Sequence, residues 1–198
     1  MSDDLVRLPS LANSRVKLVP VADRHLDLIF SAAQLGAAAW PRMGLQGTPS
    51  LQAFSDRLWA GVLAQYVVLS TGDRPAGLVS IFRADHLSRV AWCDAVEFES
   101  TFGEDPIGLT AAEQGLDVLL NYAFKVWSFR KIYCETVAGQ RSVFDHYGFA
   151  LDEANLPGDT LVAGQYHDRS IQAIYSSDWY DNAGTSNPST DFGNFPSP

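Results

Sequence analysis

The order of hydrophobic and polar positions in the first half of the chain predicts a strand, two helices and three further strands. Apolar residues alternate with polar ones in the opening segment and then recur at helical spacing, which predicts a strand followed by a helix. A second helix is expected to begin at Ser50, a residue type that caps helix N-termini. The turn sequence Thr71-Gly72-Asp73 between two apolar runs is typical of a β-hairpin. The predicted strands are residues 15–21, 66–70, 76–82 and 90–99, and the predicted helices are residues 22–35 and 50–62.

The second half of the chain opens with a long amphipathic segment at residues 107–127. Its apolar residues fall on one stripe of a helix, so the helix is expected to pack on a sheet along that side. The stripe comprises Leu109, Ala112, Leu116, Leu119, Leu120, Ala123 and Trp127. A strand at 131–137, a helix at 140–149 and a closing strand at 165–175 are predicted to follow. The pattern therefore predicts a mixed α/β fold.

Length and composition indicate one domain with a polar C-terminal segment. A chain of 198 residues with 46% hydrophobic residues is long enough to bury a sizeable core. We expect the domain to occupy residues 1–180. Residues 181–198 contain no Leu, Ile, Val, Lys or Arg and are rich in Ser, Asn, Pro and Gly. Such a segment buries too little apolar surface to offset ordering, so it is predicted to be a flexible tail.

Charge and cysteine usage narrow the classes of partner. The formal charge of −9 disfavours nucleic acid or an anionic membrane as a partner, because both are bound through a basic face. It suits a cationic substrate such as an amine, although an acidic surface that serves only solubility is an equal alternative. Two cysteines, no secretory signal and no apolar run of membrane-spanning length favour the cytoplasm. The four histidines lack ligand spacing, so no metal is expected.

Four fragments, in this order and spacing, resemble the GNAT superfamily of N-acetyltransferases, especially its ribosomal-protein-type branch. They are Asn121-Tyr122-Ala123-Phe124, Arg130-Lys131-Ile132-Tyr133, Ser142 with Gly148-Phe149, and Tyr166-His167-Asp168 with Tyr175 and Asp178-Trp179. The resemblance covers about residues 15–179. It implies an α/β (α+β) fold with a mixed, mostly antiparallel sheet flanked by helices. It also implies an acyl-CoA-dependent N-acyltransferase, a monomer or a homodimer, in which a small-molecule amine attacks the thioester of acetyl-CoA or another acyl-CoA directly.

The resemblance assigns acyl-CoA binding to the end of one strand and to the turn that opens the long helix. The residues so assigned are Phe98, Glu99, Ser100, Gly108, Leu109, Thr110, Ala111, Ala112, Arg141 and Phe144. The turn departs from the family pattern, because Ile107 stands at the position of a Gln or Arg and Thr110 at that of a glycine. A side chain at Thr110 limits how closely the backbone can approach a phosphate.

The charges around this turn also disfavour a phosphate. No Lys or Arg lies between Arg89 and Lys125, whereas the interval contains several acids. Thr110 and Glu113 form a capping-box sequence, in which the Glu113 carboxylate competes for the donors that a pyrophosphate needs. Arg130, Lys131 or Arg141 on later elements could offset that charge.

Candidate catalytic groups lie on the strand at 90–99 and in the helix predicted at 140–149. Acyl transfer to an amine needs a base for the ammonium proton, and either Asp94 or Glu97 can serve; alternation places the two on opposite faces of the strand. Ser142 is the candidate acid for the departing thiolate, or it merely caps the helix. Phe144 stands where relatives carry a Tyr, and Tyr147 is either a substitute or a core residue.

Trp40 and Met43, in the loop after the first helix, and Glu135 are the candidate acceptor-binding residues; Trp40 and Met43 alternatively cover the core. Two other readings of the chain stay open beside the acyltransferase. One is an enzyme of the same fold that uses another donor or reaction, and the other is a non-catalytic binding domain.

Overall fold

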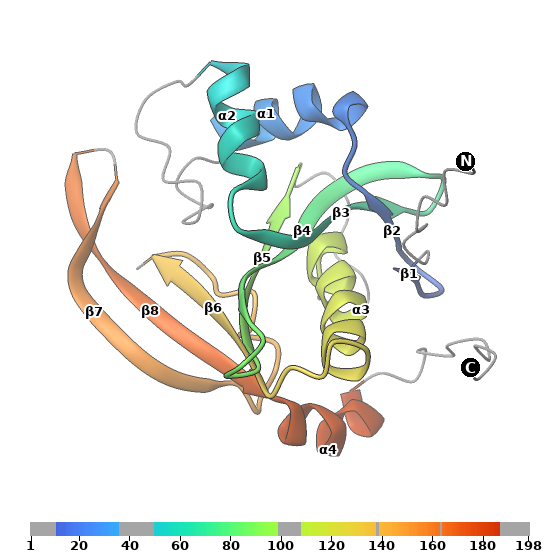
Figure 1. Cartoon of the computed structure of the whole chain (residues 1–198), viewed down its shortest axis with the longest axis vertical. Helices are drawn as coiled ribbons and strands as arrows, with labels where there is room; N and C mark the ends of the chain where they lie inside the picture. Colours follow the sequence, from blue (N-terminus) through green and yellow to red (C-terminus); the bar gives the residue numbers. More distant parts are fainter. Residues whose placement is uncertain (1–10, 36–49, 99–107, 138, 163, 187–198) are drawn as a thin grey trace.

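The computed structural model describes residues 11–35, 50–98, 108–137, 139–162 and 164–186. Within them one sheet runs in the order β1-β2-β3-β4-β5-β6-β8-β7 (Figure 1). The strands are β1 (Leu11–Ala12), β2 (Lys17–Pro20), β3 (Val62–Ser70), β4 (Arg74–Asp85), β5 (Val90–Glu97), β6 (Lys131–Val137), β7 (Leu151–Val162) and β8 (Gln165–Tyr175). The helices are η1 (Asp23–His25), α1 (Leu26–Leu35), α2 (Leu51–Trp59), α3 (Ala111–Lys125) and α4 (Ser176–Ser186). Every pair of neighbouring strands is antiparallel except β5 and β6, which confirms the mixed, mostly antiparallel sheet.

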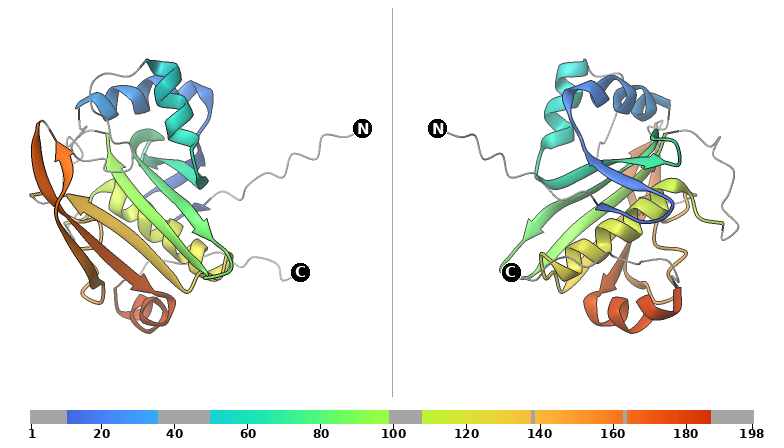
Figure 2. Two further views of the ribbon diagram at one scale, coloured as in Figure 1. Left: turned by 60° about the vertical axis from the view of Figure 1, so that its left-hand side comes forward. Right: turned by 90° about the vertical axis from the view of Figure 1, so that its right-hand side faces the viewer.

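The sheet separates two hydrophobic cores, because alternate strand positions point to opposite faces. Tyr66 and Val68 of β3 belong to the core beneath α3, whereas Val67 between them belongs to the core beneath α1 and α2. Figures 1 and 2 show α1 and α2 together at one end of the sheet and α3 alongside its strands. Each residue on β3, β4 or β5 therefore faces either the α3 side or the α1–α2 side.

Helix α3 lies unusually close to the sheet because glycines stand at the points of contact. A Cβ added to Gly115 would lie 2.5 Å from Cγ2 of Val68, and one added to Gly77 of β4 would lie 2.9 Å from the Cβ of Ala112. The first turn of α3 is thus held directly against β4. The predicted apolar stripe is confirmed for Leu116, Leu119, Leu120 and Ala123, which are fully buried. Leu109 and Trp127, its predicted ends, lie outside α3 and are half-buried.

Residues 139–150 form a series of turns, so the helix predicted at 140–149 is wrong. Side chains capture backbone donors here: Asp145 Oδ2 accepts from the Ser142 N–H at 2.9 Å, and Ser142 Oγ accepts from the Phe144 N–H at 3.1 Å. Ser and Asp side chains that bind nearby backbone groups compete with helix formation. Gly139 adds a left-handed turn, with φ of +87°.

Strand β7 was not predicted from the sequence, which indicated no element between residues 149 and 165. It is the outer strand of the β7–β8 hairpin, and most of its residues are exposed, so no apolar alternation marks it. Pro157 and Gly158 fall in an irregularity of the pairing between Leu156 and Thr160. An edge strand tolerates both residues at such a bulge.

Several predicted boundaries also differ from those in the structure. Helix α2 ends at Trp59, three residues before the predicted end, and Gly61 follows with φ of +66°. Helix α4 continues to Ser186, so the first part of the predicted flexible tail, residues 181–186, is helical. Residues 187–198 lie outside the described residues.

Candidate functional site

The parallel strands β5 and β6 separate along their length and leave a cleft. They pair only at Val90 with Lys131, Ala91 with Ile132 and Trp92 with Tyr133. The rings of Trp92 and Tyr133, the last of these pairs, stack with centroids 5.0 Å apart. Beyond them the two strands are no longer partners, so backbone groups on the facing edges are left for a ligand.

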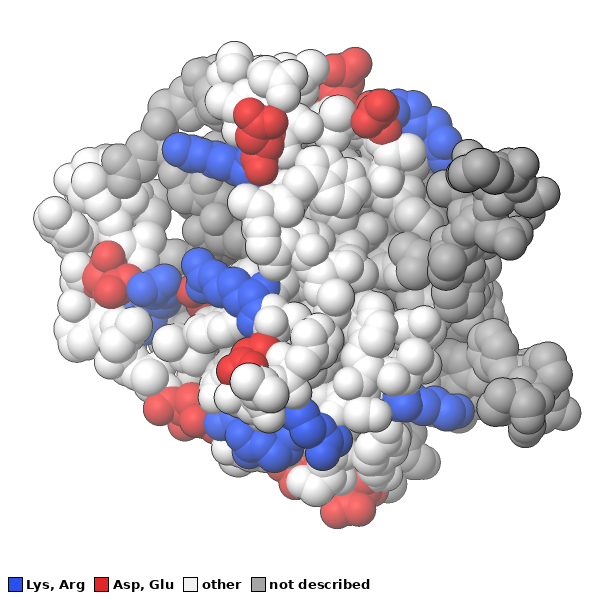
Figure 3. All heavy atoms as spheres, viewed as in Figure 1, with Lys and Arg blue, Asp and Glu red and all other residues white. Residues whose placement is uncertain are grey.

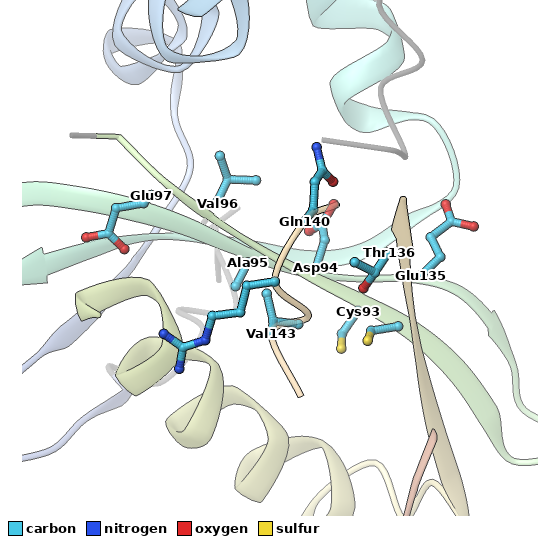
Figure 4. Close-up of a pocket in the computed structure, with 11 residues that line it drawn as sticks. Cys93, Asp94, Ala95, Val96, Glu97, Glu135, Thr136, Gln140 and Val143 are labelled. Carbon is cyan, nitrogen blue, oxygen red and sulfur yellow. The ribbon is translucent and has the colours of Figure 1, made fainter. Parts of the chain in front are cut away.

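The cleft has a cavity volume of about 360 Å³ and acidic walls (Figure 4). It is lined by Cys93, Asp94, Ala95, Val96, Glu97, Cys134, Glu135, Thr136, Gln140, Arg141 and Val143. Three of these residues are acids and one is a cation. Figure 3 shows charged side chains of both signs around a hollow beside the β7–β8 hairpin, and the described residues of this face form no broad basic patch.

Asp94 is the carboxylate on the α1–α2 side of the cleft. It alternates with Cys93 and Ala95, which belong to the α3 core, and shares its face with Val96. Ser80 of β4 is its cross-strand partner and donates its hydroxyl proton to Asp94 Oδ1. This bond orients a half-buried carboxylate at the cleft wall.

A polar row crosses the sheet at Asp94, and sequence reasoning missed it. Gln65 of β3 is the register partner of Ser80, which in turn pairs with Asp94. Gln65 is only 4% exposed, and neither atom of its side-chain amide has a hydrogen-bond partner. Buried polar groups are normally paired, so the orphaned amide of Gln65, two strands away from Asp94 in the same row, is an exception. The available signal was a polar residue at the inward position of three neighbouring strands.

Glu97, the other predicted base, turns away from Asp94 to the N-terminus of α3. Its Oε2 accepts from the Ala112 N–H at 3.3 Å. Burial raises the pKa of Glu97, and hydrogen bonds from Thr110 and from the backbone of Ala112 and Ala111 partly oppose that rise. Glu97 is therefore an additional cap of α3, supplied by a strand fifteen residues earlier in the chain.

Glu113 completes the capping box predicted from the sequence. Its Oε2 accepts from the Thr110 N–H at 2.8 Å, and its own N–H donates to Thr110 Oγ1 at 3.2 Å. Arg141 Nη2 lies 3.1 Å from the second oxygen of Glu113. The first turn of α3 thus carries two carboxylates, and the arginine that lines the cleft is paired with one of them.

Ser142, Phe144 and Tyr147 do not line the cleft, although Arg141 and Val143 beside Ser142 do. The Ser142 hydroxyl donates to Gln172 Oε1 at 2.5 Å and accepts from the Phe144 N–H at 3.1 Å, so its proton is already committed. Phe144 is fully buried in the α3 core and does not contact the cavity. The Tyr147 hydroxyl donates to Asp117 Oδ1, and burial raises its pKa well above the ordinary value. All three residues stabilise the turns after β6.

The other predicted site residues are divided among the cleft, the core and the undescribed segments. Glu135 lines the cleft, but it is paired with Arg169 at 2.9 Å. Phe98 is buried in the α1–α2 core, and Gly108 is exposed with φ of +71°. Half-buried Leu109 precedes the cap of α3, and Ala111 packs into the α3 core. Trp40, Met43, Glu99 and Ser100 lie outside the described residues.

The two cysteines lie next to each other at the narrow end of the cleft, one residue beyond the last pair of β5 and β6. Burial raises the pKa of Cys134 to about 12 and that of Cys93 well above its ordinary value. Both thiols therefore stay protonated near neutral pH and are poor nucleophiles.

The described part of the chain contains no group of three His, Cys, Asp or Glu side chains placed to hold a metal ion. No helix within it is both long enough and apolar enough to cross a membrane.

The strand order, the two helical layers and the splayed parallel pair define the GNAT acetyltransferase fold. A solved spermidine N-acetyltransferase from Vibrio cholerae, in complex with CoA and spermine, matches with a TM-score of 0.70 at 16% identity, over 85% of this chain and 99% of that chain. A protein described as a probable acetyltransferase matches with a TM-score of 0.67 at 16% identity, over 86% of this chain and 99% of its own. No protein-family model matches the sequence, and no curated protein does either. At such identities the likeness establishes the fold.

Proposed function

We propose that the chain is an N-acyltransferase that moves an acyl group from a thioester to the amine of a small cationic molecule. The observation that carries the proposal is the opening between β5 and β6, with the oriented carboxylate of Asp94 on its wall. Its occurrence in a fold shared with N-acetyltransferases supports the same reading. The acidic walls and the net charge of −9 favour a cationic acceptor over an anionic one.

The facing edges of β5 and β6 suit the arm of a thioester donor. An arm that contains amide groups can hydrogen-bond to exposed strand edges as an additional strand does. For acyl-CoA, the pantetheine arm therefore fits the cleft. The diphosphate of acyl-CoA does not fit the first turn of α3, where Glu97 and Glu113 already accept from the N–H groups. No step of the proposed reaction depends on the nucleotide.

Asp94 is the proposed base, and the reaction needs no acid from Ser142. Asp94 takes one proton from the ammonium group, and the free amine attacks the thioester carbonyl carbon. The C–N bond forms and the C–S bond breaks. A second proton leaves the nitrogen and ends on the departing sulfur, which completes the thiol.

The acceptor is proposed to occupy the α1–α2 side of the cleft. Asp94 faces that side, and the orphaned amide of Gln65 lies in the same polar row. A cationic amine on this side can pair with the Asp94 carboxylate, which lines the cavity. The solved neighbour in complex with spermine makes polyamines the first acceptors to try.

The test is acyl transfer by the purified chain from S-acetyl thioesters to a panel of amines that includes spermidine and spermine. Thiol release and the mass of the acetylated amine report the reaction. We expect transfer that Asp94→Asn lowers by about 100-fold or more, the usual range for a lost general base. Asp73→Asn is the matched control, because Asp73 is exposed in the β3–β4 turn. Thiol release no faster than the uncatalysed rate with every thioester and amine contradicts the proposed function.

A further inference from the structure

The first turn of α3 is already occupied by protein groups. The Thr110 and Ala112 N–H groups donate to the carboxylates of Glu113 and Glu97, at 2.8 Å and 3.3 Å. The Glu113 N–H donates to Thr110 Oγ1, and the Gln114 N–H donates to the Thr110 carbonyl. Burial raises the pKa of Glu97, and a hydrogen bond with the Ala111 backbone partly lowers it again. The donors that make a helix N-terminus an anion site are therefore engaged.

The charges at this turn repel a diphosphate as well. Glu97 and Glu113 bring two carboxylates to one helix end, where a bound anion would need to be close to both. Glu113 is 5% exposed, so its carboxylate is not a mobile surface group. Arg141 lines the cleft, but its guanidinium forms a salt bridge with Glu113, with 3.1 Å between Nη2 and Oε1. Arg169, which contacts the cleft residue Glu135, is also paired with Asp159.

Packing fixes this arrangement against the sheet. Ala112 lies against Gly77 of β4 so closely that a Cβ at Gly77 would be 2.9 Å from it. The same Cβ would be 2.7 Å from the carbonyl oxygen of Val96, one residue before Glu97. The end of β5 and the start of α3 are thus held together, which keeps Glu97 within reach of the helix amides. An incoming phosphate cannot open the turn by moving α3 alone.

We propose that the donor is an acyl-pantetheine thioester whose binding uses the β5–β6 cleft alone, with no nucleotide diphosphate seated on α3. This inference rests on the proposed function and specifies its donor. The arm has two possible sources, a small free thioester and a carrier protein that bears the same arm. In either case Glu97, Glu113 and Arg141 stabilise α3 and set the donor class by excluding the diphosphate.

The first test compares binding of two thiols that share the arm, coenzyme A and pantetheine, by calorimetry on the full chain. We expect dissociation constants within about threefold of each other, because the nucleotide end makes no favourable contact. Adenosine 3′,5′-bisphosphate at millimolar concentration is expected not to compete. Coenzyme A binding more than about tenfold tighter than pantetheine, or competition by the bisphosphate, overturns the inference.

Variants then test whether the two carboxylates are the cause. The double variant Glu97→Ala and Glu113→Ala vacates the helix amides, and it is expected to tighten coenzyme A about tenfold while pantetheine changes by less than about threefold. The double variant Glu97→Gln and Glu113→Gln keeps both caps but removes their charge, and it replaces the alanine pair if that pair fails to fold. It is also expected to bind coenzyme A more tightly than the wild type. Asp73→Asn is the control for total charge. No gain in coenzyme A binding in a folded double variant overturns the inference.

Kinetics separate failure of this inference from failure of the proposed function. Comparable rates with S-acetylpantetheine and acetyl-CoA support both. Transfer from acetyl-CoA alone overturns the donor inference and leaves the proposed function standing. Transfer from no thioester, with neither thiol bound, overturns both. A faster rate with an acetylated carrier protein than with S-acetylpantetheine supports the inference and identifies a protein as the source of the arm.

Discussion

The two sides of the β5–β6 cleft differ in what their polar side chains contact. On the α1–α2 side, Asp94 lines the cavity and accepts a hydrogen bond from the Ser80 side chain. The amide of Gln65, two strands away in the same row, has no partner. On the α3 side, the carboxylates of Glu97 and Glu113 accept hydrogen bonds from backbone N–H groups at the start of the helix. Two acids three positions apart on one strand therefore have different uses. The strand face and what packs against it decide the role, not the residue type.

The largest predicted effect is the difference in kcat between variants of the two acids of β5, Asp94 and Glu97. Asp94→Asn is expected to lower kcat for amine acylation by about 100-fold or more, whereas Glu97→Gln is expected to leave kcat within about threefold. The reason is that Asp94 faces the side proposed for the acceptor, whereas Glu97 caps a helix. Steady-state kinetics with a saturating amine measure both variants. Equal losses in the two would show that Glu97 also handles the proton.

Ser142 sharpens the comparison, because its hydroxyl contacts the protein and not the cavity. Ser142→Ala removes a bond to Gln172 and one from the Phe144 N–H, so the free energy of unfolding is expected to fall by about 1–3 kcal/mol. Urea denaturation measures the loss. Turnover at a temperature where the variant stays folded should be unchanged. A large loss of kcat without a loss of stability would restore Ser142 as the acid.

The cap of α3 gives the next smaller effect. Thr110→Ala removes the hydroxyl that accepts from the Glu113 N–H, and about 1 kcal/mol of unfolding free energy should be lost. Thr110→Ser, which keeps the hydroxyl, is the matched control. The same denaturation curves report both variants, and an unchanged midpoint for the alanine variant would mean that Glu97 alone suffices as a cap.

The smallest predicted effect is a pH dependence of stability that comes from Glu97. Its folded pKa lies above the ordinary value of 4.5, so its contribution favours folding at low pH and is lost as the pH rises from the unfolded value through the folded pKa. Glu97→Gln should therefore match the wild type well below pH 4.5 and become relatively more stable as the pH rises toward 7.

Glu153 provides a control of opposite sign for this measurement. Its pKa is lowered, first of all by a hydrogen bond from Lys131, so its contribution is present above the unfolded pKa and is lost as the pH falls through the folded pKa. Glu153→Gln should be destabilising at neutral pH and approach the wild type in acid. Denaturation midpoints at several pH values test both variants. The same trend in the two would contradict the assigned environments.

Much of the framework could be predicted because its signals are local. Apolar spacing marked α3, and the Thr110–Glu113 pair marked its cap, which the structure confirms. The strand at 131–137 was also correct. Strand β7 was not predicted because an exposed edge strand with Pro157 carries no apolar alternation. The turns after β6 were not predicted because the apolar spacing of that segment suits a helix, whereas Ser142 and Asp145 bind local backbone donors there.

The site was less predictable because its decisive contacts are long-range. Nothing near Glu97 in the sequence indicates that it accepts from Ala112 on another element. The row of Gln65, Ser80 and Asp94 requires the register of three strands, which residue patterns do not specify. By contrast, the acids around the turn that opens α3 were visible in the sequence, and so was the capping box that the structure confirms.

The most direct test of the account is an NMR titration that follows the backbone amides of Thr110 and Ala112. With pantetheine, we expect the amide signals of the cleft residues of β5 and β6 to shift. The signals of the Thr110 and Ala112 amides should not shift. Addition of adenosine 3′,5′-bisphosphate should leave both amides unmoved, because Glu113 and Glu97 retain them. A saturable shift of the Thr110 and Ala112 amides with the bisphosphate would contradict the account, since it would show phosphate at the start of α3.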